Sequence, residues 1–209
     1  MPRHSFGERS AHWLTVFAFL FLTATGLGFL FSPFFSLFGF LGTLQTAQFL
    51  HPVFGIVMAC SLFCLGLFNI RHVFWERGDG AWLAHFGDVI RGREHEVCEV
   101  GQYNTGQKAL FWAISFLLII LLVTGLIIWR PYFANNFTVE ALRLALFIHS
   151  VAACLLILSI FVHVYMAFWY RGTLRGMLRG TVTRAWAEMH HPRWLRQLEA
   201  ASEEKKEVV

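Results

Sequence analysis

The stretch that decides the fold runs from Leu142 to Tyr170 and reads LRLALFIHSVAACLLILSIFVHVYMAFWY. With Arg143 as its single charged residue, it is long enough to cross the hydrocarbon core of a bilayer as a helix. Its two histidines, His149 and His163, are fourteen residues apart, so both leave the same helix face, roughly 21 Å apart along the axis. Because the hydrocarbon core is about 30 Å thick, we expect one histidine toward each side of the membrane.

The composition places the whole chain in the membrane class. Of its 209 residues, 56% are hydrophobic and only 14% are charged, which is less charge than soluble domains carry. Four apolar stretches are long enough to span a bilayer, at about 13–31, 52–70, 109–129 and 142–170. The sequence therefore predicts an all-α integral membrane protein with a four-helix transmembrane bundle. The first stretch is too long for a signal h-region and lacks a small-residue cleavage pattern, so we expect it to be retained.

Basic residues are distributed unevenly over the expected connections. Five Lys and Arg lie in the loop 71–108, two precede the first helix, and eight lie in the tail 171–209. The connection 32–51 has no Lys or Arg, and the connection 130–141 has one. By the positive-inside rule, both termini and the long loop are therefore cytoplasmic. The net charge of +4 reflects this topology, and without a basic stripe or a stacking platform we expect no nucleic-acid partner.

The chain divides by composition into a transmembrane domain, residues 1–170, and a basic cytoplasmic tail, residues 171–209. No linker or repeat suggests a second globular domain. Within the cytoplasmic loop 71–108, we expect a short helix over about 81–97 that lies on the membrane surface. Its membrane-facing side chains would be Trp82, Phe86 and Val89.

The topology gives four histidines a depth, and depth alone pairs them. His12 enters the first helix at the cytoplasmic side, and His163 lies about two turns short of that side in the fourth helix. His51 opens the second helix at the opposite side, before Pro52 at a position suited to a helix start, and has the depth of His149. Two facing imidazoles in a bundle core are typical of bis-histidine haem ligation. We therefore predict two haems, one held by His51 and His149 and one by His12 and His163.

A plainer interpretation stays open for each of these residues. A histidine in a membrane helix can simply hydrogen-bond a neighbouring helix, and glycines can simply permit close packing. Small residues that would let a flat macrocycle approach the backbone are Gly26, Gly28, Gly55, Gly66, Gly125, Ser150, Ala152 and Ala153. Packing alone accounts well for the glycines. Two histidines on one face, each with a partner at matching depth, favour haem.

Cysteine usage decides the haem type. The chain has no Cys-x-x-Cys-His attachment motif, so the haems are expected to be non-covalent b-type groups. We expect Cys60, Cys64 and Cys154 to be small packing residues and Cys98 to be a reduced cytoplasmic thiol. The spans contain no activated nucleophile, paired carboxylates or phosphate loop. The chain is therefore expected to carry electrons rather than to transform an organic substrate by itself.

Several blocks go beyond a general haem-binding pattern. They are 101–108 (GQYNTGQK) with Phe111 and Trp112, 125–133 (GLIIWRPYF), 165–172 (YMAFWYRG) and 190–194 (HHPRW). These blocks resemble the cytochrome b556, or gamma, subunit of respiratory formate dehydrogenase, and the resemblance runs nearly end to end. It implies the ligand pairs that depth predicts: His12 and His163 for the cytoplasmic-side haem, and His51 and His149 for the periplasmic-side haem.

The resemblance also implies a quinone site beside the cytoplasmic-side haem, where menaquinone or ubiquinone is reduced. Asn104, Gly106 and Gln107 match the turn that lies close to the quinone in the family, and His163 would be both haem ligand and neighbour of the quinone. An amide-rich turn at a helix entrance offers hydrogen-bond donors next to water, which a quinone needs. Without the resemblance, the same turn is more simply a turn and helix cap.

The resemblance further implies partners and a location. A periplasmic alpha subunit containing molybdenum or tungsten would pass electrons through an iron–sulfur beta subunit to the outer haem, the inner haem and the quinone. Proton uptake from the cytoplasm at the quinone would then contribute to a protonmotive force. The chain would be a multi-pass protein of the bacterial inner membrane, in three-subunit units that assemble further into a trimer.

Two alternatives stay open at this point. The chain could be the cytochrome b subunit of a membrane-bound hydrogenase or another molybdoenzyme, which uses similar histidine patterns in four or five helices. It could also be a haem-free membrane anchor that holds a peripheral complex. The loop and tail blocks argue against the first alternative, and a reduced-minus-oxidised spectrum separates the second.

Overall fold

The computed structural model describes residues 1–37, 39, 43–91, 100–130 and 132–207. All regular elements in these residues are helical, and one isolated antiparallel bridge joins Pro2 to Thr181. The chain divides into two compact units. The bundle consists of Gly7–Phe68 and Ala113–Tyr165, and the loop-and-tail unit consists of Met1–Phe6, Asn69–Trp112 and Met166–Val209. The prediction of an all-α fold is confirmed.

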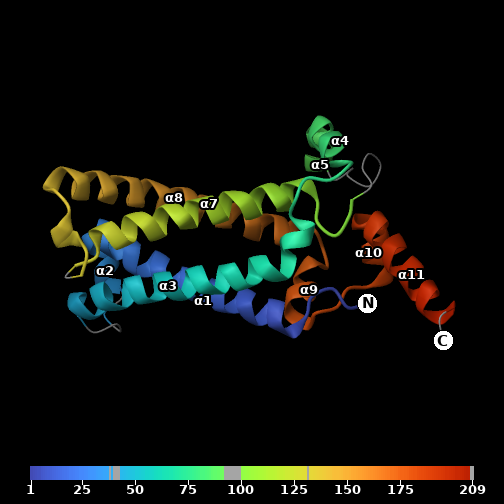
Figure 1. Ribbon diagram of the computed structural model, residues 1–209, viewed down its shortest axis with the longest axis horizontal. Helices are drawn as coiled ribbons and strands as arrows, with labels where there is room; N and C mark the ends of the chain where they lie inside the picture. Colours follow the sequence, from blue (N-terminus) through green and yellow to red (C-terminus); the bar gives the residue numbers. More distant parts are fainter. Residues whose placement is uncertain (38, 40–42, 92–99, 131, 208–209) are drawn as a thin grey trace. The chain divides into compact units, whose positions relative to one another are not determined.

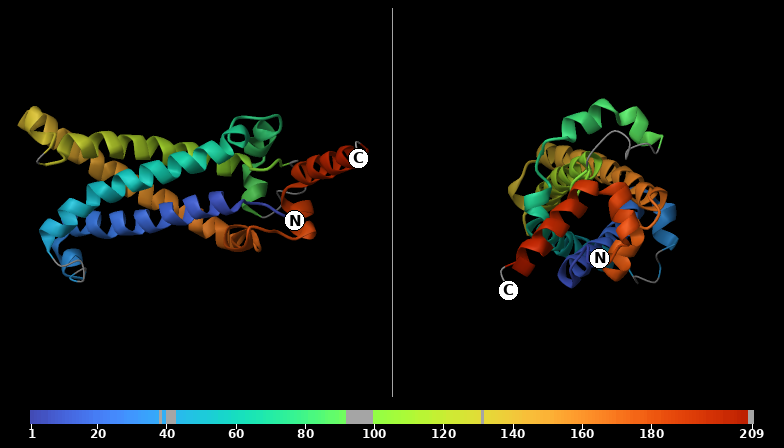
Figure 2. Two further views of the ribbon diagram at one scale, coloured as in Figure 1. Left: turned by 60° about the horizontal axis from the view of Figure 1, so that its bottom comes forward. Right: turned by 90° about the vertical axis from the view of Figure 1, so that its right-hand side faces the viewer.

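Four long helices make up the bundle and run side by side in alternating directions (Figures 1 and 2). They are α1 (Phe6–Leu30), α3 (Leu44–Asn69), α7 (Thr105–Ile128) and α8 (Val139–Trp169). Each is long and apolar enough to cross a membrane, which confirms the four predicted spans. Two shorter helices, α2 (Ser32–Leu37) and η3 (Ala134–Asn136), lie in the connections.

The bundle has a small apolar core and an apolar outer face. Its core is built from one buried residue of each long helix: Ala18, Met58, Leu118 and Leu156. On the outer face, every long helix carries a phenylalanine that is more than half exposed: Phe17, Phe63, Phe116 and Phe161. Helices that are apolar on all sides are typical of membrane spans, whose lipid-facing surface needs no polar residues.

The long helices begin earlier than the apolar stretches do, and α3 shows the difference most clearly. We predicted that His51 and Pro52 open this helix, but the helix begins at Leu44 and Pro52 lies inside it. The residues before His51 include Gln45, Thr46 and Gln48, so the helix continues beyond its apolar part. A proline inside a helix removes one backbone hydrogen bond, a loss that membrane helices tolerate when neighbouring groups compensate.

The loop-and-tail unit is built from short helices. They are η2 (Ile70–His72), α4 (Asp79–Ala84), α5 (Phe86–Ile90), α9 (Thr173–Arg179), α10 (Arg184–His190) and α11 (Pro192–Glu207). The expected surface helix over 81–97 is instead two short helices, and residues 92–99 lie outside the described chain. Trp82 is buried in the unit rather than lying on a membrane surface, because it packs against Gly106. Phe86 is exposed as expected.

The core of this unit joins residues that are far apart in the sequence. His191 is buried and donates a hydrogen bond from Nδ1 to the Gly101 carbonyl at 2.7 Å, and its Nε2 lies 3.4 Å from the Arg3 guanidinium. That guanidinium also lies over the Trp194 ring, 4.4 Å from the ring centre. The N-terminal segment, the loop and the tail therefore pack against one another and form one unit.

Candidate functional site

Four histidines of the bundle meet in two pairs. His51 of α3 and His149 of α8 have ring centroids 6.4 Å apart, with ring planes inclined by 57°. His12 of α1 and His163 of α8 also have centroids 6.4 Å apart, with planes inclined by 47°. The structure therefore brings together the residues that the sequence paired by depth, and it gives both pairs the same separation.

That separation suits one iron atom between each pair of rings. Two imidazoles on opposite sides of a metal have ring centroids about 6 Å apart, because each metal–nitrogen bond is about 2 Å long. A direct ring-to-ring hydrogen bond, with nitrogens about 3 Å apart, would draw the centroids closer than 6.4 Å. The geometry of both pairs thus fits bis-histidine ligation of haem iron.

The hydrogen bonds at the His51–His149 pair leave the ligating nitrogens available. Thr25 Oγ1 lies 2.7 Å from His51 Nδ1 and donates its hydrogen to the Phe21 carbonyl at 2.8 Å. Because a hydroxyl has a single hydrogen, this arrangement suits a His51 ring that carries its proton on Nδ1 and donates it to Thr25. Its Nε2 then has the lone pair that a metal ligand needs.

The same arrangement recurs at the second ring of this pair. Thr124 Oγ1 lies 2.9 Å from His149 Nδ1 and donates to the Ile120 carbonyl at 2.6 Å. Neither threonine was predicted as a site residue, although the sequence contains a signal for both. The tripeptide Thr-Gly-Leu occurs in the first span at 25–27 and in the third at 124–126.

Glycines lie where a flat group would need room. A Cβ built on Gly26 would lie 3.5 Å from His51 Cε1, and one built on Gly125 would lie 3.3 Å from His149 Cε1. Gly55 lies one turn after His51, on the helix face that also carries Met58 of the core, and no heavy atom lies within 4 Å of a Cβ built there. The helix surface one turn after His51 is therefore open.

The two histidine pairs are separated by the apolar core. On α8, Leu156 lies midway between His149 and His163, seven residues from each, or about 10 Å along the axis. His12, His51 and His149 are half-buried, whereas His163 is exposed. The two candidate centres therefore lie at different depths of one bundle.

The predicted quinone turn belongs to the loop-and-tail unit and has a clear local role. The Asn104 backbone N–H donates to Gln107 Oε1 at 3.0 Å, and the Gln107 backbone N–H donates to Asn104 Oδ1 at 2.8 Å. This is a reciprocal capping box at the start of α7, and it uses the oxygen of each side chain rather than the amide nitrogen. A Cβ on Gly106 would lie 3.0 Å from the Trp82 ring, so the glycine permits this close contact.

A buried ionic network lies directly behind this turn. Asp79 accepts hydrogen bonds from the Glu76 backbone N–H at 2.6 Å, from Thr105 Oγ1 at 2.7 Å and from Lys108 Nζ at 3.0 Å. Burial by itself would raise the pKa of Asp79, but these hydrogen bonds and the Lys108 charge outweigh burial and hold the pKa below its usual value. The network fixes the beginning of α7 against α4.

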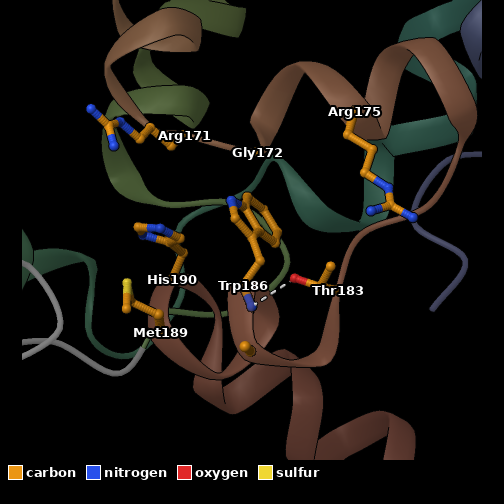
Figure 3. A pocket seen from close by; sticks show the side chains of 8 residues that line it. Arg171, Gly172, Arg175, Thr183, Trp186, Met189 and His190 are labelled. Carbon is orange, nitrogen blue, oxygen red and sulfur yellow. Dashed lines mark hydrogen bonds between the residues drawn. The ribbon is translucent and has the colours of Figure 1, made fainter.

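The same unit contains a hollow of about 350 Å³ beside Trp186, shown in Figure 3. Its lining includes Arg171, Arg175 and His190, and Thr183 accepts a hydrogen bond from the Trp186 backbone N–H at 3.2 Å. The polar residues around it come from the tail, and none of them was a predicted site residue.

The cysteines do not take the positions that we expected. Cys60, Cys64 and Cys154 are exposed on the bundle rather than packed in its core, which is formed by other apolar side chains. Cys98 lies outside the described residues. Among the residues that the structure describes, no three His, Cys, Asp or Glu side chains group as a metal-ion site.

Comparison with known proteins gives a consistent result. Residues 3–180 match the family model described as prokaryotic cytochrome b561. Over 203 residues, the chain is 43% identical to the nitrate-inducible formate dehydrogenase cytochrome b556(Fdn) subunit of Escherichia coli (strain K12), covering 97% of this chain and 94% of that protein. It is also 43% identical over 205 residues to the formate dehydrogenase cytochrome b556(fdo) subunit of the same organism, covering 98% and 96%.

A third relative, from Haemophilus influenzae, is a formate dehydrogenase cytochrome b556 subunit and is 43% identical over 195 residues, covering 93% of this chain and 82% of that protein. These matches confirm the resemblance carried by the loop and tail blocks, and cytochrome b membership implies haem b as cofactor. The chain therefore belongs to the prokaryotic cytochrome b561 family and, within it, to the cytochrome b subunits of formate dehydrogenase.

Proposed function

We propose that this subunit binds two b haems and conducts electrons across the inner membrane to a quinone. His51 and His149 would hold the periplasmic-side haem, and His12 and His163 the cytoplasmic-side haem. The observation that carries the proposal is the common 6.4 Å separation of the two histidine pairs, at two depths of one bundle. When bound, each haem supplies a centre that gains and loses one electron.

The protein's own residues would hold the two haems in place and exclude water from the space between them. The four imidazoles would hold the two haems, and His149 and His163 lie roughly 21 Å apart along the α8 axis. The core layer around Met58 and Leu156 excludes water between the two levels. Burial in an apolar bundle and the bonds to the second ring nitrogen tune the potential of a ligated iron.

The quinone proposal rests on one exposed ligand and one amide-rich turn. His163 is exposed, so a quinone could approach the cytoplasmic-side haem at this residue. Asn104 and Gln107 are amide residues whose side-chain oxygens cap α7, and amide nitrogens are donors of the kind that suits a quinone carbonyl. Gly106 keeps the turn narrow beside Trp82. Menaquinone and ubiquinone both present this carbonyl chemistry.

The proposed partners follow from the family and from the charge distribution. The relatives are named as subunits of formate dehydrogenase, so we propose an iron–sulfur beta subunit and a molybdenum- or tungsten-containing alpha subunit on the periplasmic side. The excess of Lys and Arg in the loop and tail supports cytoplasmic termini. With proton uptake on the cytoplasmic side, electron transfer would contribute to a protonmotive force. Assembly of these heterotrimers into a trimer is part of the same proposal.

Ligand substitution tests the proposal in the purified complex. We expect His149→Leu to lose the periplasmic-side haem while retaining the other, because Leu cannot ligate iron. His163→Leu should lose the cytoplasmic-side haem and quinone reduction together. The measurement is haem per polypeptide with a reduced-minus-oxidised spectrum, and His85→Leu, on an exposed residue of the loop, is the matched control. Unchanged haem content in either ligand variant would contradict the assignment, and a complex without a b-type α band would favour a haem-free anchor.

A further inference from the structure

We infer that two Thr–Gly pairs, Thr25–Gly26 on α1 and Thr124–Gly125 on α7, are positioning residues for the His51–His149 centre. They fix the tautomer and the orientation of both rings, and thereby lower the reduction potential of an iron bound between them. This inference rests on the proposed function, because it requires a haem at that pair. It concerns neighbouring helices that supply no ligand to this centre.

The two Thr–Gly pairs make the same contacts on different helices. Each threonine places Oγ1 within 2.9 Å of a histidine Nδ1, and each following glycine lets the backbone approach Cε1 of the same ring. Thr25 is 1% exposed and Thr124 is 7% exposed, so both hydroxyls are buried polar groups within a membrane span. One ring is thus held by α1 and the other by α7, although α3 and α8 carry the histidines.

The direction of each hydrogen bond is fixed by the threonine's own helix. Each hydroxyl lies within hydrogen-bond distance of a carbonyl one turn earlier, of Phe21 or Ile120, and when it donates there its oxygen accepts from the ring. With Nδ1–H as donor, Nε2 is the nitrogen that carries the lone pair. A partner that holds the second ring nitrogen also makes the ligand more basic, which stabilises the ferric form of the iron.

The glycines allow the helices that carry the threonines to approach the histidine rings closely. The Cβ built on Gly125 lies 3.3 Å from His149 Cε1, and this contact is tighter than ordinary van der Waals packing. Alanine there would push the ring away from Thr124 by a few tenths of an ångström unless the helices move apart. The glycine therefore lets the threonine come close enough to bond Nδ1, and the two residues act as one unit.

The test compares Thr→Val with Thr→Ser in the intact purified complex. Valine has the shape of threonine but no hydroxyl, whereas serine keeps the acceptor oxygen and the bond to the helix carbonyl. In Thr25→Val and Thr124→Val, we expect the midpoint potential of the periplasmic-side haem to rise. A shift of about 30 mV, which is about a threefold change in the ratio of ferric to ferrous iron for one electron, would be measurable. The haem is identified as the one lost in His149→Leu.

The conservative variants and the control complete the test. Thr25→Ser and Thr124→Ser should restore the wild-type potential and the wild-type low-spin electron paramagnetic resonance signal. Thr15→Val removes a hydroxyl of the same helix that bonds Ser61 at 2.8 Å, and it should leave the potential of the periplasmic-side haem unchanged. The valine variants could also lose the periplasmic-side haem. In that case, serine variants that retain this haem would support the inference.

Two results would overturn the inference while leaving the proposed function intact. One is an unchanged potential and signal in both valine variants with two haems still bound. The other is serine variants that behave like valine variants. Failure of the proposed function has a different signature, because the wild-type complex would then lack a haem that depends on His149.

Discussion

To hold a haem, His51 and His149 each have to offer one ring nitrogen to the iron while the other ring nitrogen keeps a hydrogen-bond partner. At His51 and His149 this is achieved by a threonine hydroxyl whose single hydrogen is already committed to its own helix. A buried Nδ1–H without an acceptor would cost about 1–3 kcal/mol, so the threonines also stabilise the folded bundle. Thr25 and Thr124 therefore serve two purposes: each provides a partner for a histidine Nδ1, and each stabilises the contact between two helices.

Gly55 provides a residue-level test of where the macrocycle lies. In Gly55→Leu, the new side chain would meet no protein atom within 4 Å of its Cβ, so the bundle should still fold. It would occupy the face beside His51, and we expect loss of the periplasmic-side haem with retention of the other. Haem per polypeptide and thermal stability are measured together, with Ile56→Leu on the exposed side of α3 as control. A Gly55→Leu complex with both haems would place the macrocycle elsewhere.

Two substitutions at Asn104 distinguish its role as a helix cap from its proposed role in quinone binding. Asn104→Ala removes the cap of α7, which is worth about 1 kcal/mol, whereas Asn104→Ser keeps a capping oxygen and removes only the amide. If the amide binds the quinone, both variants should form quinol about tenfold more slowly, since about one hydrogen bond is lost. Steady-state quinone reduction and thermal stability are the two measurements, with haem content as control. Wild-type turnover in Asn104→Ser would make the turn purely structural.

The site residues differ in how far the sequence predicts them. The histidines are recognisable because ionisable residues are rare in apolar spans, and fourteen-residue spacing puts His149 and His163 on one face. Thr25 and Thr124 are not recognisable in the same way, because hydroxyls commonly bond their own helix. Their contact with a ring depends on helix rotation and on an approach within 3 Å, and no single-helix pattern encodes either.

At the scale of elements, apolar runs predict that a helix exists better than where it begins. All four spans were predicted, but the structure begins each helix earlier, at Phe6, Leu44, Thr105 and Val139. An apolar run marks the edge of the hydrocarbon, whereas a helix ends where its backbone hydrogen bonds find caps. Capping by Asn104 and Gln107 decides the start of α7.

The loop-and-tail unit was the least predictable element. Its core depends on contacts between Arg3, Gly101 and His191, which are separated by about ninety residues or more in the chain. No local periodicity encodes such contacts. Trp82 illustrates the consequence, because an amphipathic stretch suggests a membrane surface and the structure buries the ring against Gly106.

His191 makes this unit sensitive to acid. Burial, aided by the Arg3 charge, lowers the pKa of His191 to about 3 from an ordinary value of 6.5. An opened form binds a proton below about pH 6.5 while the folded form stays neutral, so the unit is fully stable above that pH and loses about 2 kcal/mol by pH 5. Hydrogen–deuterium exchange of the tail, corrected for intrinsic rates, should show this opening. His191→Gln should flatten the dependence, and His85→Gln should not; an equal dependence in all three proteins would contradict it.

At the scale of the whole molecule, the residues of the proposed function are distributed over the two units. The bundle has an apolar outer face for lipid and two polar levels inside it, each built around a histidine pair. The loop-and-tail unit gathers the basic residues and the turn at the start of α7.

The most direct test of the central claim is an experimental density map of the native complex in a lipid environment. We expect two planar densities in this subunit, one between the rings of His51 and His149 and one between those of His12 and His163. In each, both imidazoles should approach the metal through Nε2. Density for a single macrocycle, or histidine rings that contact only protein and lipid, would contradict the account.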